Sequence, residues 1–328
     1  MIFMKKIKYY LLLFVVTLIV SSCGTKRVVP ISGRTQSLLV SDEQILSLSN
    51  QEYASYMQSA KKSTNANNTA VVKNVGKRLA NAVEQYLSAN GMESELNQYQ
   101  WEFNLIQDAS VNAFCMPGGK IVVYEGMLPV AQDETSLAIV VGHEIAHAVA
   151  KHSAEQMSTQ IRQQYGTQIA GMLLNQVGVN SQITQLEQVV AQQGFQFRNL
   201  KYSRDNEYEA DRMGLIIAAM AGYDPQRAIP FWQRMAEASG NANATDAYSD
   251  HPSDANRIAA MEEYVKEALQ YYKPVATSTK TNTKTTAKAA TTAKSATSTK
   301  TSSTKTNYTT PAKTTTKTIS ADALSKKK

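Results

Sequence analysis

Apolar and polar residues follow one another along most of this chain with the spacing of amphipathic helices. Apolar side chains recur three and four positions apart in five stretches, which we predict to be helical: 42–60, 70–89, 133–157, 203–221 and 253–273. Two short segments are typical of strands, because 101–106 alternates and 120–124 is rich in β-branched and aromatic residues. The expected fold class is therefore α+β, a mostly helical domain with a small β-sheet beside the central helix.

Local signals set the expected ends of these helices. Asp133 is placed to cap the helix that follows it, with the acidic Glu134 in the first turn. Gly222 closes the helix over 203–221, and Asp224-Pro225 starts a further helix directly afterwards. Residues 156–196 contain 12 Gln, and we expect a helical excursion there that acts as a mobile cover.

The first 22 residues have the pattern of a secretion signal. Three lysines precede the apolar run 9–20, which is shorter than the roughly 20 residues that a transmembrane helix needs. The next residues, Val20-Ser21-Ser22-Cys23, resemble the lipobox of bacterial lipoproteins, which predicts that Cys23 is lipidated and anchors the protein to a membrane. Gly24 in place of Asp then favours the bacterial outer membrane, with the protein facing the periplasm. The alternative is an ordinary signal peptide followed by an unrelated cysteine.

The opposite end of the chain has a biased composition. Residues 275–328 contain 19 Thr and 11 Lys, which is typical of a disordered segment. We therefore divide the chain into a signal peptide (1–22), a tether (23–36), one folded domain (37–274) and a disordered tail (275–328). The basic tail either binds an anionic envelope polymer, such as peptidoglycan or lipopolysaccharide, or is a spacer without a partner; its composition favours the spacer.

The distribution of charge excludes one broad class of function. The formal net charge of +7 and the pI of 9.1 come from the two ends, because residues 23–274 hold 20 basic and 26 acidic residues. We therefore expect no nucleic-acid partner. Two cysteines exclude a disulfide framework, and we expect Cys115 to be a buried small residue.

The residues that carry chemistry lie in the predicted helix over 133–157, as His143-Glu144-Ile145-Ala146-His147. Residues i and i+4 of a helix share a face with Cβ atoms about 5–6 Å apart, so both imidazoles can reach one Zn²⁺ ion at about 2.0–2.1 Å. Glu144 lies one position round the helix, where it can act as a general base without binding the metal. The alternative is a helix with two hydrogen-bonded core histidines, but chance produces this motif in under about 1% of such chains.

A catalytic zinc site needs a third protein ligand, and the predicted helix over 203–221 offers carboxylates. Glu207 and Asp211 are again four residues apart and share a face, whereas Glu209 points about 200° away from Glu207. The alternative is an acidic stripe on a solvated helix. Three apolar residues at 215–217 follow directly, however, and they predict that this helix is largely buried.

These motifs together resemble the HtpX-type metallopeptidases, the gluzincin family that includes the CAAX prenyl protease and the β-barrel-assembly-enhancing protease. The resemblance covers about residues 32–270 and rests on these segments: Asn112-Ala113-Phe114, Pro117-Gly118-Gly119, His143 to His147, Ser203-Arg204, Glu207, Ala210-Asp211 and His251-Pro252-Ser253. It implies a zincin-type metallopeptidase fold. Because no transmembrane helices flank the motif, the chain is most similar to the single-domain periplasmic lipoprotein branch.

The resemblance also implies roles for individual residues. Glu207 is the expected third zinc ligand, and Asp211 supports the metal site or donates a proton. The segment Asn112-Ala113-Phe114 resembles the edge strand along which such peptidases align an extended substrate. His251 resembles a histidine that approaches the zinc ion and restrains activity; a histidine that merely precedes a helix is an equal alternative. His152 falls on the helix face opposite the ligands, and we expect it to be structural or solvated.

We therefore expect a zinc-dependent endopeptidase with one zinc ion per chain, anchored as a lipoprotein, that cleaves misfolded or extended proteins of the cell envelope. In the expected reaction, zinc held by His143, His147 and Glu207 activates a water molecule, and Glu144 carries a proton from it to the leaving amine. The alternative is a lipoprotein chaperone or assembly factor whose metal site is vestigial or held shut. Residues 156–196 and His251 would then serve as cover and latch.

Overall fold

Helix α6 (Glu134–Val149) runs through the middle of the computed structural model, which describes residues 24–174, 196–240 and 255–274. Asp133 caps this helix as expected, since its side chain accepts a hydrogen bond from the backbone N–H of Ser136 at 2.7 Å. Every residue from Ser136 to His147 is buried. A helix that is apolar nearly all round needs neighbours on every side, which explains its central position.

A three-stranded sheet lies beside α6. Its strands are β3 (Glu102–Ile106), β4 (Ala113–Met116) and β5 (Lys120–Tyr124). β5 lies in the middle, parallel to β3 and antiparallel to β4, with Phe114 opposite Val122. Gly118 and Gly119, both with positive φ, make the turn between β4 and β5. Within the described part of the chain β4 pairs with β5 alone, so it is an edge strand in contact with α6.

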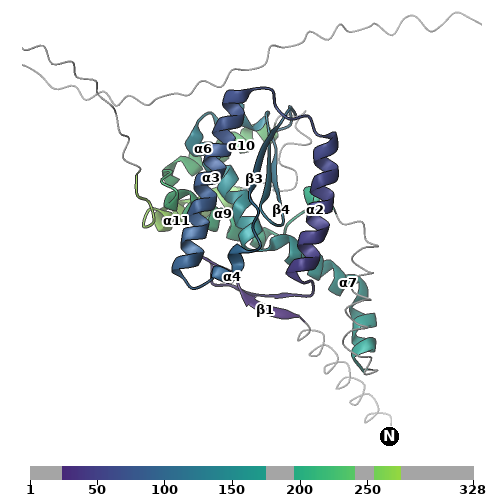
Figure 1. Cartoon of the computed structure of the whole chain (residues 1–328). Helices are drawn as coiled ribbons and strands as arrows, with labels where there is room; N and C mark the ends of the chain where they lie inside the picture. The colour runs from purple at the N-terminus through teal and green to yellow at the C-terminus, as the bar shows by residue number, and fades with distance from the viewer. Residues whose placement is uncertain (1–23, 175–195, 241–254, 275–328) are drawn as a thin grey trace, which may run out of the picture.

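Helices enclose α6 and the sheet (Figure 1). α3 (Ala66–Ala89) lies against α6 and β3, while α9 (Arg204–Met220) packs along α6. α11 (Ala255–Ala268) packs on α9 and on α10 (Ala228–Gly240). The other elements are α2 (Asp42–Ser59), α4 (Glu93–Leu96), α5 (Met127–Ala131), α7 (His152–Leu174) and the 3-10 helices η1 (Phe197–Asn199) and η2 (Pro225–Arg227).

The sequence pattern locates most of these helices, and the α+β class is confirmed. α2 and α9 match their predicted ranges closely, because capping boxes at Ser41 and Ser203 fix where they begin. α3 begins four residues before the predicted position 70, since Asn65 caps it by accepting a hydrogen bond from the N–H of Asn68. None of the helices in the described ranges has the length and apolar character needed to cross a membrane.

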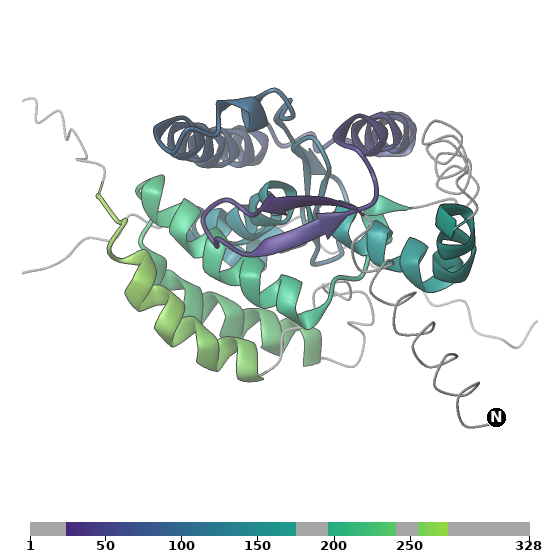
Figure 2. The same cartoon turned by 90° about the horizontal axis from the view of Figure 1, so that it is seen from below.

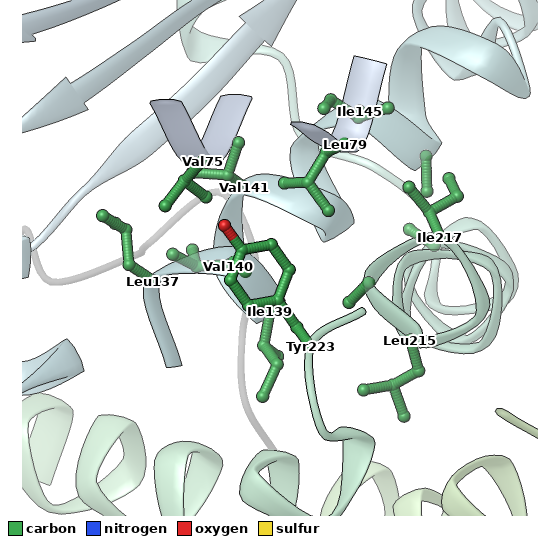
Figure 3. Close-up of a cluster of buried hydrophobic side chains, with 14 of the residues drawn as sticks. Val75, Leu79, Leu137, Ile139, Val140, Val141, Ile145, Leu215, Ile217 and Tyr223 are labelled. Carbon is green, nitrogen blue, oxygen red and sulfur yellow. The ribbon is translucent and has the colours of Figure 1, made fainter. Parts of the chain in front are cut away.

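α6 and α9 approach each other at two glycines. A Cβ atom on Gly142 would lie 2.8 Å from the carbonyl oxygen of Gly214, and one on Gly214 would lie 2.7 Å from the backbone nitrogen of His143. A larger residue at either position would push the two helices apart. Figure 3 shows part of the apolar cluster that holds them, including Val75, Leu79, Leu137, Ile139, Val140, Val141, Ile145, Leu215, Ile217 and Tyr223.

The region predicted as one helix over 133–157 is in fact two helices. α6 ends and α7 begins on either side of Lys151, which has a left-handed φ of 53°. A tertiary contact holds this conformation, because the Lys151 amine donates to both carboxylate oxygens of Asp42 at 2.7 and 2.8 Å. The prediction was wrong because the local sequence has no glycine or proline at the break. His152 consequently does not lie where a continuous helix would place it.

The segment predicted as a tether (23–36) contributes an ordered hairpin. β1 (Thr25–Val28) and β2 (Thr35–Leu38) pair in antiparallel fashion, and Figure 2 shows the hairpin lying across one face of the molecule. Val29 is fully buried, and the Gln36 amide donates to the carbonyl of Ala150, between α6 and α7, at 3.0 Å. The Gly, Pro and Ser content of this segment suggested a flexible tether, but these long-range contacts order it.

Candidate metal centre

Three side chains from two helices converge inside the domain. His143 and His147 lie one turn apart on α6, with their Nε2 atoms 3.0 Å apart. Glu207, in the first turn of α9, places its Oε2 atom 3.5 Å from the His143 Nε2 atom and its Oε1 atom 3.6 Å from the His147 Nε2 atom. All three residues are buried and could together hold a metal ion, as the sequence predicts.

The donor set fits zinc. Two imidazole nitrogens and one carboxylate oxygen are the protein ligands of a common type of catalytic zinc site, in which a fourth position stays open. Tetrahedral ligands at about 2.0–2.2 Å from the metal lie about 3.3–3.6 Å from one another. The two imidazole nitrogens here are 3.0 Å apart, and they lie 3.5 and 3.6 Å from different oxygens of Glu207, so the side chains can hold one zinc ion after adjustment.

The carboxylates beside His143 control its protonation. Burial alone would lower the pKa of His143, but hydrogen bonds and charge from Asp211 and Glu207 outweigh it and raise the pKa to about 9. The His143 Nδ1 atom lies 2.9 Å from the Asp211 Oδ1 atom. A metal ion at this site would compete with a proton for the imidazole, and Asp211 contacts the ring nitrogen that does not face the cluster.

Arg257 of α11 joins the two carboxylates of the site. Its Nε and Nη2 atoms bind the two Asp211 oxygens, each at 2.7 Å, and its Nη1 atom lies 3.1 Å from the Glu207 Oε2 atom. The guanidinium lies 4.6 Å from the centre of the Trp232 ring, and Arg257 is only 3% exposed. This buried cation offsets part of the negative charge of the site.

Sequence reasoning overlooked Arg257, although a signal was present. Arg257, Met261 and Val265 recur every four residues and form the buried face of α11. An arginine in the apolar stripe of an amphipathic helix is rarely buried without a carboxylate partner. The acidic face of α9, with Glu207 and Asp211, was the available partner.

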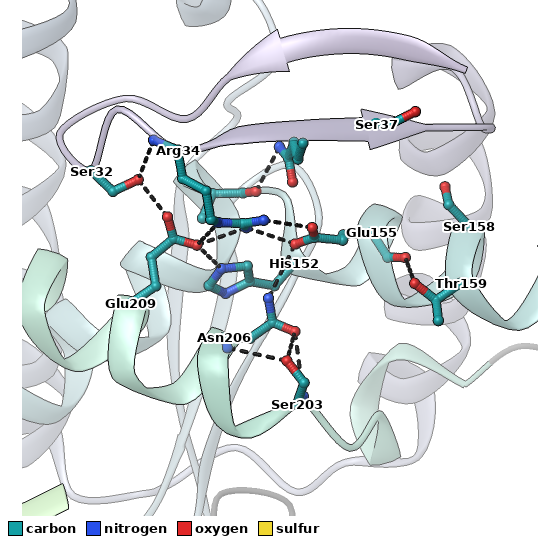
Figure 4. Close-up of polar contacts among 12 residues, drawn as sticks. Ser32, Arg34, Ser37, His152, Glu155, Ser158, Thr159, Ser203, Asn206 and Glu209 are labelled. Carbon is teal, nitrogen blue, oxygen red and sulfur yellow. Dashed lines mark hydrogen bonds and ion pairs between the residues drawn. The ribbon is translucent and has the colours of Figure 1, made fainter. Parts of the chain in front are cut away.

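A second group of polar side chains contacts His147 on the side away from the cluster. Figure 4 shows this group from His152 onward. The His147 Nδ1 atom is 2.9 Å from the His152 Nδ1 atom, and the His152 Nε2 atom is 2.9 Å from the Glu209 Oε2 atom. Glu209 also binds Arg34 and Ser32, in the loop of the N-terminal hairpin. The sequence predicts that Glu209 points away from the face of Glu207, which agrees with this position. The sequence pattern did not predict which residues Glu209 and His152 contact.

Glu144 and Cys115 lie in the same buried region. Glu144 is 1% exposed, on α6 between the two histidines. The Cys115 thiol donates to the Met116 carbonyl at 3.3 Å, and burial raises its pKa well above the usual value, with the charge of Glu144 adding to the shift. A thiol with a raised pKa is a poor nucleophile, so the interpretation of Cys115 as a buried small residue is confirmed.

The predicted substrate segment lies at the edge of the sheet. Ala113 and Phe114 are the first two residues of β4, and Asn112 immediately precedes them. The Asn112 carbonyl accepts a hydrogen bond from the Tyr124 N–H at 3.0 Å, and its side-chain oxygen accepts one from the Ala113 N–H at 2.8 Å. The Phe114 ring packs edge-on against Tyr124, which fixes this end of the strand.

Several predictions concern residues outside the described ranges. They include the signal peptide over 1–22, the lipidated Cys23, the latch histidine His251 and the tail over 275–328. Of the predicted excursion over 156–196, the first part belongs to α7, which continues to Leu174.

Several curated proteins that are similar to this chain are named as proteases. Mitochondrial metalloendopeptidase OMA1 of Schizosaccharomyces pombe is 38% identical over 176 residues, 53% of this chain and 50% of the relative. The Homo sapiens metalloendopeptidase OMA1, mitochondrial, is 30% identical over 246 residues, 74% of this chain and 46% of the relative. The beta-barrel assembly-enhancing protease of Escherichia coli is 28% identical over 183 residues, 53% and 37% respectively. The chain thus spans half or less of the length of these relatives.

The comparisons overturn the predicted localisation at the bacterial outer membrane. Relatives from Schizosaccharomyces pombe, Arabidopsis thaliana, Homo sapiens and Saccharomyces cerevisiae are all named as mitochondrial proteins. The prediction rested on Gly24, the single residue after Cys23, and on a sorting rule that holds only for bacterial lipoproteins.

The pattern of peptidase family M48 matches residues 68–265. The match covers more than half of the chain and includes His143, His147 and Glu207, the three buried metal-binding candidates. It confirms the resemblance at the level of the family, together with the expected metalloendopeptidase class and zinc cofactor. The chain belongs to peptidase family M48, a family of zinc metallopeptidases.

Proposed function

We propose that this metallopeptidase hydrolyses peptide bonds within unfolded or extended proteins, with zinc held by His143, His147 and Glu207. The observation that carries the proposal is the buried cluster of three donors, which α6 and α9 bring together from positions 60 residues apart. A zinc ion at such a site polarises the scissile carbonyl and lowers the pKa of water towards about 7.

The neighbouring side chains supply proton transfer and orientation. Glu144 follows His143 on α6 and is buried with it, so its carboxylate can accept a proton from the attacking water and pass it to the leaving amine. Asp211 acts differently, because its two oxygens are bound by Arg257 and one of them also contacts His143. We assign Asp211 the role of orienting His143 and Glu144 the role of the base.

The edge strand supports extended chains as substrates. A peptide that adds to β4 beside Asn112, Ala113 and Phe114 would form main-chain hydrogen bonds and run along α6. Backbone pairing reads chain conformation more than side-chain identity, which suits unfolded proteins as a substrate class.

We further propose that acyl chains on Cys23 attach the protein to a membrane. The residues before Cys23 support this proposal, since three lysines and the apolar run 9–20 lead into it. Two or more acyl chains would anchor the protein stably, whereas one binds only marginally. The mass of the N-terminal peptide from membrane-extracted protein tests this directly. An unmodified Cys23, or a chain that begins elsewhere, would contradict it.

The central experiment compares residues 24–328 with the same chain carrying Glu144→Gln. Both are incubated with a reduced, carboxymethylated protein as unfolded substrate, and zinc content is measured on both. We expect zinc in both and cleavage by the parent, with turnover lowered about 10²–10⁴-fold in the variant. Loss of zinc in the variant would contradict the assigned role of Glu144. Zinc without cleavage in either protein would favour the chaperone alternative.

A further inference from the structure

A continuous line of polar side chains runs from the candidate ligand His147 to the N-terminal hairpin. Figure 4 shows the part of this line from His152 to the hairpin. His147 contacts His152 through their Nδ1 atoms at 2.9 Å, and the His152 Nε2 atom contacts Glu209 at 2.9 Å. Glu209 is in turn bound by Arg34 and Ser32. Four separate parts of the chain meet in this line: α6, α7, α9 and the hairpin loop.

The geometry assigns one direction to these hydrogen bonds. The His147 Nε2 atom faces the metal cluster, so it must be unprotonated to bind a metal, and the proton is then on Nδ1. That N–H donates to the His152 Nδ1 atom, which must accept. His152 therefore carries its proton on Nε2 and donates it to Glu209. Burial lowers the pKa of His152, which is consistent with a neutral ring that accepts at one nitrogen and donates at the other.

The far end of the line is held rigidly. The Nε and Nη2 atoms of Arg34 lie 2.8 and 2.7 Å from the Glu209 Oε2 atom, and Ser32 binds the other oxygen. Arg34 also binds both oxygens of Glu155 on α7, at 2.6 and 2.7 Å. Burial disfavours the charge on Glu209, but hydrogen bonds from His152, Arg34 and Ser32 outweigh it and lower its pKa to about 2. Glu209 is therefore an anion in a fixed position.

Burial alone does not account for this arrangement. A purely structural network could end on any polar group, whereas this one ends on the one ring nitrogen of His147 that does not face the metal cluster. A group on that nitrogen fixes the tautomer and the ring plane of a histidine ligand, and it raises the basicity of the other nitrogen. Because the His152 ring is fully buried, its contact with the His147 Nδ1 atom is not exposed to competing water.

We propose that His152 and Glu209 are positioning residues for His147, and that the N-terminal hairpin completes this support through Ser32 and Arg34. The proposal rests on the proposed function, because it takes His147 as a zinc ligand. It goes beyond the family pattern in one respect. The hairpin residues 25–38 lie outside the matched range 68–265, so a segment before the family domain contributes to its metal site.

Three substitutions of His152 test the first half of the proposal in the full chain. An Asn side chain places an amide oxygen near the position of Nδ1 and keeps an acceptor for His147. A Gln side chain reaches the position of Nε2 and keeps only the contact with Glu209. We expect His152→Ala to lower zinc affinity by about 10–100-fold and to lower kcat with little change in KM. His152→Asn should restore most of both, and His152→Gln should restore neither.

A pair of arginine variants tests the hairpin. Arg34→Ala removes the cation that binds Glu209. We expect it to lower zinc affinity, as His152→Ala does, but by less than about 10-fold. Arg162→Ala is the matched control, because Arg162 binds the same hairpin at a different residue, the Ser37 carbonyl and hydroxyl, at 2.8 and 3.2 Å. It should leave zinc affinity and kcat at the parent values.

The readouts are zinc affinity by competition with a chelator, the visible spectrum of the cobalt-substituted protein, and kcat and KM on an unfolded protein. A shifted cobalt spectrum in His152→Ala and Arg34→Ala, with the parent spectrum in Arg162→Ala, supports the proposal. Parent zinc affinity and spectrum in His152→Ala would overturn it, even with lowered stability. Equal losses in the Asn and Gln variants would also overturn it. A parent chain that binds zinc without cleaving would contradict the proposed function alone, whereas one that binds no zinc would overturn both.

Discussion

The two histidines of the metal centre are supported in related but unequal ways. His143 contacts Asp211 directly, and Arg257 binds both oxygens of Asp211. His147 reaches Glu209 only through an intervening histidine, and Arg34 takes the place that Arg257 has on the other side. Both carboxylates come from α9, while one arginine comes from the last described helix and the other from the first hairpin.

The two arginines differ in how much of each is exposed to water. Arg257 is 3% exposed, whereas the Arg34 side chain is 36% exposed. Removing a buried cation leaves carboxylates without a partner in a medium of low dielectric constant, while water can replace a partly exposed one. We therefore expect substitutions among the residues that support His143 (the His143 side) to have larger effects than substitutions among those that support His147 (the His147 side). Three measurements test this difference.

The largest effect is expected from Arg257→Ala. The change leaves Asp211 and Glu207 buried beside each other without their cation, which should destabilise the zinc-free protein by about 3–5 kcal/mol. Saturating zinc should reduce this cost, because the metal restores positive charge at Glu207. Urea unfolding with and without zinc measures both. The contrast fails if Arg34→Ala costs as much as Arg257→Ala.

A smaller effect is expected from pH on zinc binding. The pKa of His143 is raised from 6.5 to about 9, so its protonated form stabilises the zinc-free fold fully below pH 6.5, and this stabilisation is lost as the pH rises through 9. Zinc must displace that proton, so affinity should rise about 50-fold between pH 7 and pH 9. Chelator-buffered titrations check this, and Asp211→Asn should flatten the dependence. A flat profile in the parent would show that His143 is not protonated in the zinc-free protein.

The smallest effect should appear on the His147 side in acid. The pKa of Glu209 falls from 4.5 to about 2 on folding, so its contribution to stability is present above pH 4.5 and is lost as the pH falls through 2. The difference in unfolding free energy between the zinc-free parent and Glu209→Gln should therefore shrink across that window. Urea midpoints at several pH values between 2 and 5 measure it. A constant difference would mean that Glu209 is not stabilised as an anion.

The His143 side was largely predictable from the sequence, and the reason is local. His143 and His147, like Glu207 and Asp211, are pairs at helical spacing, so each pair is placed by the regularity of one helix. The packing of α6 on α9 then brings the pairs together, and the apolar stretch 215–217 after Asp211 indicates that α9 is buried. Only Arg257 required knowledge of a third helix.

The His147 side was not predictable, because each of its parts depends on contacts between distant segments. Lys151, with a φ of 53°, ends the run of helix between α6 and α7. It forms a salt bridge to Asp42, which lies 109 residues away in the sequence. That break turns His152 toward His147. Arg34 lies 175 residues from Glu209, in a segment whose composition resembles a tether. The preference of each residue for helix, strand or turn contains no information about these long-range contacts.

The contact between Gly142 and Gly214 has a consequence for how this enzyme can change in evolution. The distance from His143 to Glu207 is set where two backbones touch, not where side chains interlock. Apolar residues around the crossing can therefore be exchanged, and the core can be repacked, without altering the spacing of the metal ligands. Related chains can drift far apart in their core residues and still hold the same ion, provided that these two positions keep no side chain.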